Sequence, residues 1–180
     1  SPLNTKLWSY QGLVNLIDSD SESGGVVCVP KTHLMHRKYF EENHNLSDKR
    51  LKENWFMFSE KEKEENKILS ETIKVNCKAG DFILWDSRTF HCNTTPSNSN
   101  SRCCVYICMI PKSKVDEKSI IKRKKAFDGK RCTSHHPDEV KMFPVVPRFT
   151  QEPNKVKNIM DEICSQVKLS KLQKSLACIE

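Results

Sequence analysis

Short apolar runs, several of them alternating with polar residues, are separated by polar segments over the first two-thirds of the chain. A period of two and a high content of Val, Ile and aromatic residues are typical of β-strands. The runs predict strands over Trp8–Ile17, Val26–Pro30, Thr72–Val75, Phe82–Trp85 and Arg102–Pro111. Segments rich in Asn, Ser and Thr, such as Asn93–Ser101, predict turns. Short strands separated by turns indicate a β-sandwich or a jelly-roll barrel.

Apolar residues take helical spacing elsewhere. Leu34–Lys67 is long and charged and predicts a mainly helical insert, which we expect to border the mouth of the barrel as a lid. Ser119–Phe127 predicts a basic helix, and residues 150–180 predict an amphipathic helix or a pair of helices. We therefore expect an α+β chain: a mainly β domain over residues 1–149, with the insert at residues 34–67, and a helical tail over residues 150–180.

The composition narrows the class of protein. With 180 residues and 20.9 kDa, the chain has room for one ordinary domain and a tail. A mean hydropathy of -0.63 and the lack of an apolar run near ~18 residues argue against a membrane span. Five glycines exclude collagen-like sequence, and the aromatic content of 8% argues against disorder.

The nine cysteines do not have the spacing of a scaffold. Their number is odd, they are scattered along the chain, and no Cys-x-x-Cys pair occurs, so neither a disulfide framework nor a structural zinc site is expected. Reduced thiols and the lack of a secretory signal favour a cytoplasmic protein. The chain begins at Ser1 without methionine, from which we expect that a further segment precedes it in the full protein.

The net charge of +7 is unevenly distributed. The stretch from Lys112 to Arg131 alone contributes +6, because nine Lys and Arg residues face three acidic ones. A basic stretch is compatible with nucleic acid, but aromatic residues for base stacking are not interleaved with it. An acidic small molecule or a solvated helix face produces the same pattern, so we disfavour a nucleic-acid partner.

The most informative segment is Gly80–Ile110, which reads as two strands flanking a turn. His91 and Arg102 stand equally far from the centre of that turn, so in a hairpin they would be cross-strand neighbours on one face. Tyr106 has the same parity as Arg102 along its strand, and Trp85 has the parity of His91 if no bulge intervenes.

An imidazole beside a guanidinium on an apolar face requires an anion, or a metal together with an anion, to hold the two groups there. Neutral imidazole is a good ligand for Fe(II), and a site of two histidines and one carboxylate leaves positions open for a cosubstrate and oxygen. An arginine can bind the distal carboxylate of a keto acid through two hydrogen bonds. The alternative is that His91 caps a surface turn and Arg102 forms an ordinary salt bridge.

Several motifs are similar to those of a known family. They are Gln11–Ile17 (QGLVNLI), Gly24–His33 (GGVVCVPKTH), Gly80–Asn93 (GDFILWDSRTFHCN) and Arg102, with weaker similarity at Lys124–Phe127 and Arg131–Pro137. Over about residues 1–149 the chain resembles the phytanoyl-CoA dioxygenase-like branch of the Fe(II)/2-oxoglutarate oxygenases. The resemblance implies a double-stranded β-helix (jelly-roll, cupin-like) core. It also implies hydroxylation of a small organic substrate, with 2-oxoglutarate and O2 as cosubstrates.

By the same resemblance, His91 corresponds to the distal iron-binding histidine and Arg102 to the arginine that binds the 2-oxoglutarate carboxylate. Tyr106, Thr89 and Ser87 are candidates for supplementary polar contacts, although each is equally well explained as a lining residue. His36 and His44 lie in the charged insert and are expected at the surface. The oligomeric state is not indicated by the sequence.

One departure from the family pattern matters for the site. The family takes its other two iron ligands from a His-x-Asp pair shortly before the Gln-Gly-Leu strand, and no histidine precedes Gln11 in this chain. Either the chain is a fragment that starts just after those ligands, which we favour, or it is a degenerate member that lost its iron and serves as a non-catalytic binding module. With one ligand of three, the chain alone is expected to bind iron weakly and not to turn over.

Overall fold

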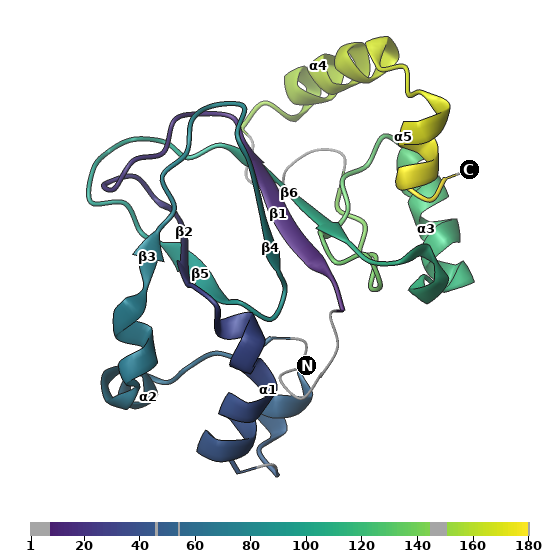
Figure 1. The fold of residues 1–180 in the computed structure, drawn as a ribbon. Coiled ribbons are helices and arrows are strands. Elements are labelled where there is room, and N and C mark those ends of the chain that lie inside the picture. The colour runs from purple at the N-terminus through teal and green to yellow at the C-terminus, as the bar shows by residue number, and fades with distance from the viewer. Residues whose placement is uncertain (1–7, 46, 54, 145–150, 180) are drawn as a thin grey trace. The chain divides into compact units, whose positions relative to one another are not determined.

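The computed structural model of the chain describes residues 8–45, 47–53, 55–144 and 151–179 (Figure 1). The chain divides into two compact units, with the boundary between Ile107 and Cys108. The boundary predicted at residue 149 falls inside the second unit and stays a prediction. Each unit is considered by itself.

Two small sheets make up most of the strand structure, and all of their residues except Cys108 and Met109 belong to the first unit. The strands are β1 (Tyr10–Asn15), β2 (Gly25–Val29), β3 (Ile73–Lys74), β4 (Phe82–Asp86), β5 (Phe90–Thr94) and β6 (Cys104–Met109). One sheet has the order β4-β1-β6 and the other the order β3-β2-β5 (Figure 1). The pairs β1–β4, β2–β3 and β2–β5 are antiparallel. The described chain is thus a mixed α/β structure with two small sheets, and the full jelly-roll remains a prediction.

The register of β2 and β5 separates the two faces of their sheet. Cys28 stands opposite His91 and Val26 opposite Asn93, so these side chains share one face. Val29 stands opposite Phe90, and both project from the other face, where they are buried. There they form the main apolar cluster with Tyr39, Phe40 and Leu51.

The segment after β2 is helical for much of its length, as predicted. It contains α1 (Thr32–Asn43), the 3₁₀ turn η1 (Lys49–Lys52), α2 (Glu60–Glu65) and the 3₁₀ turn η2 (Lys67–Glu71). Tyr39 and Phe40 of α1 pack on Phe90, with Tyr39 and Phe90 ring centroids 5.0 Å apart. The segment therefore covers the face of β5 opposite His91. The predicted lid at the barrel mouth stays a prediction; the contacts place the buried aromatic residues of α1 against Phe90, on the face of β5 opposite His91.

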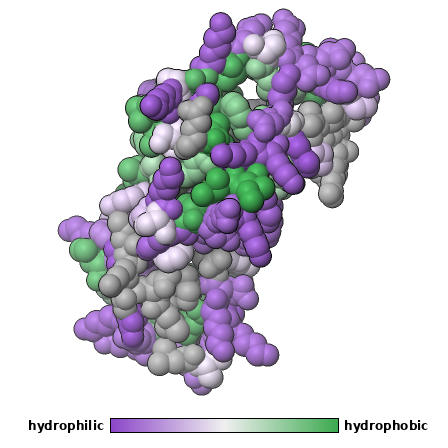
Figure 2. Space-filling model, turned by 90° about the vertical axis from the view of Figure 1, so that its right-hand side faces the viewer, coloured by the Kyte–Doolittle hydropathy of each residue, from purple (hydrophilic) through white to green (hydrophobic). Residues whose placement is uncertain are grey.

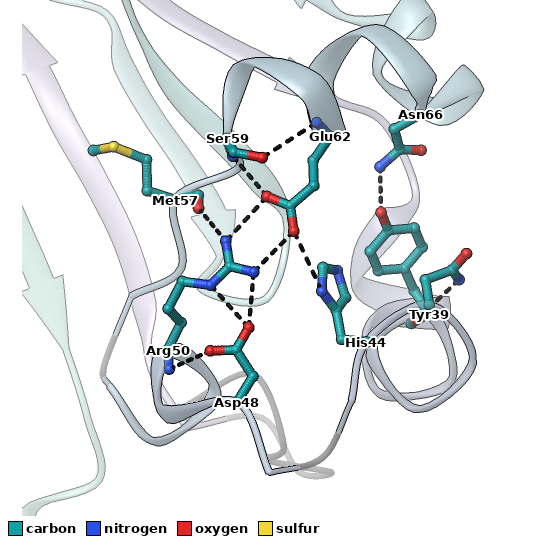
Figure 3. Close-up of polar contacts among 9 residues, drawn as sticks. Tyr39, His44, Asp48, Arg50, Met57, Ser59, Glu62 and Asn66 are labelled. Carbon is teal, nitrogen blue, oxygen red and sulfur yellow. Dashed lines mark hydrogen bonds and ion pairs between the residues drawn. The ribbon is translucent and has the colours of Figure 1, made fainter.

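An ion-pair network connects the parts of this segment (Figure 3). Arg50 donates two hydrogen bonds to Glu62, at 3.0 and 2.9 Å, and pairs with Asp48. The Arg50 hydrogen bonds lower the pKa of Glu62 to about 2. Glu62 also closes a capping box with Ser59 at the start of α2, so one carboxylate joins η1 to α2.

Replacing Glu62 by glutamine is expected to lower the free energy of unfolding by about 1–2 kcal/mol at pH 7, because a charge-assisted pair with Arg50 is lost from a partly exposed site. Since the folded pKa of Glu62 is depressed, this contribution is present above the unfolded pKa and is lost as the pH falls toward 2. Urea denaturation measures the change. Glu65→Gln on the same helix is the control, because the Glu65 side chain is 67% exposed and 3.7 Å from Lys61; an equal loss in both variants would contradict the prediction.

Two histidines of this segment are partly enclosed by aromatic side chains, contrary to the expectation that they lie at the surface. The His44 side chain is only 6% exposed and packs against Phe40 and Phe56, with Nδ1 3.5 Å from Glu62. His36 packs edge-on against Phe40 and Phe90. Burial lowers the pKa of His36 to about 4 and also lowers the pKa of His44. The charged composition of the segment concealed them, because the aromatic residues that enclose them are spread along the sequence.

Lowering the pH from 7 to 5 is expected to destabilise the fold through His36 by about 1–2 kcal/mol. The unfolded histidine titrates near 6.5 and the folded one near 4, so the unfolded state binds more protons in this window and stability falls with pH. His36→Leu should flatten the dependence of the urea midpoint on pH. An unchanged slope in this variant would show that another group carries it.

The second unit is helical. It contains the 3₁₀ turn η3 (Lys112–Lys114) and the helices α3 (Glu117–Asp128), α4 (Pro153–Gln166) and α5 (Lys171–Leu176). Asp116 caps α3 by accepting a hydrogen bond from the Ser119 backbone. These elements confirm the helices predicted over residues 119–127 and near the C-terminus.

On the face shown in Figure 2, many of the described side chains are hydrophilic, and apolar side chains are exposed among them. None of the helices described in the structure is long and apolar enough to cross a membrane. The nine cysteines are free thiols.

Candidate functional site

His91 is fixed at the start of β5 from both sides of the strand. Its neighbour Phe90 is buried in the aromatic cluster, and the Phe90 N–H donates to the Thr32 hydroxyl at 2.8 Å. On the other face, the His91 ring lies 5.1 Å from the ring of Trp85. Nearby protein atoms lower the pKa of His91 by desolvation, so the imidazole is neutral at pH 7.

The tautomer of His91 follows from its backbone contact. Nδ1 lies 2.7 Å from the carbonyl oxygen of Thr89, which can only accept a hydrogen bond, so Nδ1 carries the proton. Nε2 is then the nitrogen with a lone pair, as in histidines that bind a metal through Nε2. Thr89, a candidate for a cofactor contact, thus orients the imidazole through its backbone.

Arg102 forms a polar cluster with one residue from each sheet. Its Nη1 donates to Asn93 Oδ1 at 3.0 Å and to the Tyr106 hydroxyl at 3.1 Å. The Tyr106 hydroxyl donates to Asn93 Oδ1 at 3.3 Å, and the guanidinium carbon lies 5.6 Å from the Tyr106 ring centre. Arg102 also lines a narrow gap between the sheets with Leu13 and Val26.

The prediction that a hairpin pairs His91 with Arg102 is wrong. β5 pairs with β2, and β6 lies beside β1 in the other sheet. Both strands form their backbone hydrogen bonds with strands that are far away in the sequence. The two residues are nevertheless linked through neighbours that bridge the two sheets. Trp85 of one sheet contacts His91 of the other, and Arg102 reaches Asn93, which shares the face of His91.

Arg88 lies between the two strands and is paired within the chain. Its Nη2 donates to Asp86 Oδ2 at 2.7 Å and its Nε to Asp86 Oδ1 at 3.0 Å. Burial raises the pKa of Asp86, but the hydrogen bonds from Arg88 outweigh burial and lower the pKa overall. This carboxylate serves to fix the turn between β4 and β5.

The described residues do not make a complete iron site. No group of three or more His, Cys, Asp or Glu side chains is placed to hold a metal within the part of the chain that the structure describes. His91 supplies one suitable nitrogen. His135 and His136 stack with ring centres 4.4 Å apart, but they belong to the second unit. The described residues are better suited to bind a carboxylate than a metal ion, because the planar guanidinium of Arg102 matches a carboxylate group.

Asn93 is the site residue that the sequence reasoning missed. The sequence pattern places it in the turn Asn93–Ser101, whereas β5 continues to Thr94. The available signal was its position two residues after His91, which puts a polar side chain on the same face of a strand.

Comparison with known proteins identifies the family of the chain. The family model for phytanoyl-CoA dioxygenase (PhyH) matches residues 9–104, which is more than half of the chain and includes His91, Asn93 and Arg102. A curated protein of Aspergillus versicolor, Ava biosynthesis cluster protein O, is 27% identical over 133 residues. The match covers 71% of this chain and 43% of the fungal protein, so the chain spans less than half the length of this relative. No solved structure matches the chain significantly. On the evidence of the family match, the chain belongs to the phytanoyl-CoA dioxygenase family.

Proposed function

We propose that this chain is part of an Fe(II)- and 2-oxoglutarate-dependent dioxygenase that hydroxylates a small organic substrate. The observation that carries the proposal is the arrangement of His91 and Arg102. His91 has an Nε2 lone pair available, and the guanidinium of Arg102, which is suited to a carboxylate, bonds to Asn93 on the His91 face of β5. Both residues lie within the region that matches the family. In the proposed reaction, 2-oxoglutarate and O2 yield succinate, CO2 and the hydroxylated substrate.

The chain's own residues have separate parts in this proposal. Arg102 binds the distal carboxylate of 2-oxoglutarate and thereby orients the keto acid. The Tyr106 hydroxyl accepts a hydrogen bond from the Arg102 guanidinium and lies beside the proposed carboxylate position. His91 contributes one nitrogen ligand, whose direction the Thr89 carbonyl fixes. The remaining metal ligands lie outside this set of residues, which therefore does not complete the iron site by itself.

A second candidate function is a non-catalytic binding module that uses the Arg102 cluster to hold a carboxylate. The observation favouring it is that the Arg102 cluster offers a guanidinium to a carboxylate, while the described residues form no group of three possible metal ligands. In this case the chain would bind a dicarboxylate without consuming it.

The test compares two proteins. One is the chain as given, and the other is extended by whatever residues its transcript encodes before Ser1. We expect the extended protein, with Fe(II) and O2, to release succinate from 2-oxoglutarate slowly even without a substrate, and we expect the chain alone to release none. Failure of the extended protein to form succinate, together with retained binding of 2-oxoglutarate, would favour the binding module.

A further inference from the structure

Asn93 joins the polar cluster around Arg102 from the β3-β2-β5 sheet, whereas Arg102 and Tyr106 come from β6 and the residues just before it. Its Oδ1 accepts hydrogen bonds from Arg102 Nη1 at 3.0 Å and from the Tyr106 hydroxyl at 3.3 Å. Tyr106 itself accepts from the same Nη1 at 3.1 Å. The three hydrogen bonds form a closed triangle. In it, Asn93 Oδ1 accepts from both Arg102, which precedes β6, and Tyr106, which lies in β6.

This triangle of hydrogen bonds restricts a side chain that would otherwise be mobile. An arginine loses substantial rotamer freedom when it is ordered, and a single contact leaves its guanidinium free to rotate about that contact. Two hydrogen bonds to Nη1, together with the Tyr106 ring 5.6 Å from the guanidinium carbon, set the plane and direction of the group. The structure gives Nε and Nη2 no protein partner among the described residues.

It also matters that residue 93 is an asparagine rather than an aspartate. An asparagine oxygen accepts from Nη1 without carrying a charge, so Arg102 keeps its full positive charge for a ligand. An aspartate of the same shape would make a charge-assisted pair and would compete with an incoming carboxylate. Since Asn93 stands two residues from His91 on the same face of β5, it also ties the guanidinium to the strand that presents the imidazole.

We propose that Asn93 is a positioning residue that holds the Arg102 guanidinium ready for the distal carboxylate of a dicarboxylic 2-oxo acid. This inference rests on the proposed function, in which that acid is 2-oxoglutarate. Asn93 acts through Arg102: its neutral amide orients the guanidinium without compensating its positive charge.

The first test uses the chain as given and needs no turnover. The NMR signal of the Arg102 Nε–H group reports whether the guanidinium is ordered. We expect a sharp, shifted signal in the parent chain and a broadened signal near the position of a free arginine in Asn93→Ala. Cys92→Ala is the matched control, because residue 92 lies on the opposite face of the same strand and should leave the signal unchanged. An unchanged Arg102 signal in Asn93→Ala would overturn the positioning role.

The second test measures binding of 2-oxoglutarate and of pyruvate, which lacks the distal carboxylate, to the extended protein loaded with Mn(II). Asn93→Ala should weaken 2-oxoglutarate binding about 5- to 10-fold, and Asn93→Asp about 10- to 100-fold, which is the range for a charge-assisted contact. Pyruvate binding should change less than about twofold in either variant, as it should for both acids in Cys92→Ala.

Thermal unfolding of each variant separates these effects from misfolding, and Asn93→Asp keeps the size of the side chain. Binding of 2-oxoglutarate to both Asn93 variants within about twofold of the parent would overturn the inference. If the parent protein itself binds 2-oxoglutarate no better than pyruvate, the proposed function fails instead, while the Arg102 signal still decides whether Asn93 positions the guanidinium.

Discussion

Replacement of His91 by alanine is expected to abolish the conversion of 2-oxoglutarate to succinate in the extended protein. A facial site of three protein ligands cannot hold the metal in its working geometry when one nitrogen is removed. The structure makes the effect specific to this side chain, because the neighbouring Phe90 is buried in the core and its N–H donates to the Thr32 hydroxyl, and neither contact involves the imidazole. Succinate release and the iron content of the same preparation provide the measurement.

Two controls accompany the His91 variant. Cys92→Ala alters the adjacent residue on the other face of β5 and should retain succinate release. The urea midpoint of His91→Ala should stay close to that of the parent, since residue 91 is exposed and the core lies on the other side of the strand. Retention of both iron and succinate release in a folded His91→Ala protein would remove His91 from the iron site.

The comparison of sequence with structure shows which features are local. Strands over residues 10–15, 25–29, 82–86 and 104–109 were predictable, because alternation and β-branched residues are properties of a few adjacent positions. The helix α3 was predictable for the same reason, and the structure adds that Asp116 caps its start.

Strand pairing was not predictable in this way. The hairpin hypothesis assumed that neighbouring strands pair, but β5 turns to β2, more than 60 residues earlier in the chain, and β6 lies in the sheet of β1. The contact of Arg102 with Asn93 therefore joins two sheets rather than two strands of a hairpin. The sequence reasoning expected His91 and Arg102 to be cross-strand neighbours, whereas the structure relates them through Asn93, which shares the face of His91 and bonds to Arg102.

The burial of aromatic and histidine side chains within the charged insert could not be predicted from neighbouring residues in the sequence either. Tyr39 and Phe40 are adjacent, and their partners Phe56, Phe58 and Phe90 are distant in sequence. The aromatic residues surround His44 only when these segments pack together in the fold. The charged composition of the insert therefore led to the expectation that His44 lies at the surface. The charged residues themselves include Arg50 and Glu62, which link η1 to α2.

Replacement of Arg102 by lysine is expected to act on the cosubstrate rather than on the metal. Lysine keeps the charge but has no planar fork, so it cannot hold Asn93 and Tyr106 through one nitrogen and still present two parallel donors to a carboxylate. Losing one charge-assisted hydrogen bond costs about 1.5–3 kcal/mol, which corresponds to a rise of about 10- to 100-fold in the 2-oxoglutarate concentration required.

The measurement is succinate release as a function of 2-oxoglutarate concentration in the extended protein, with iron content determined in parallel. For Arg102→Lys we expect a raised KM for 2-oxoglutarate, a kcat changed by less than about threefold and an unchanged iron content, because the lost interaction binds the far end of the cosubstrate. His91→Ala should show the reverse pattern, with loss of iron as well as turnover. An Arg102→Lys variant with the parent's dependence on 2-oxoglutarate would mean that another residue binds the carboxylate, and the cluster of Arg102 with Asn93 and Tyr106 would then be a structural link between the two sheets.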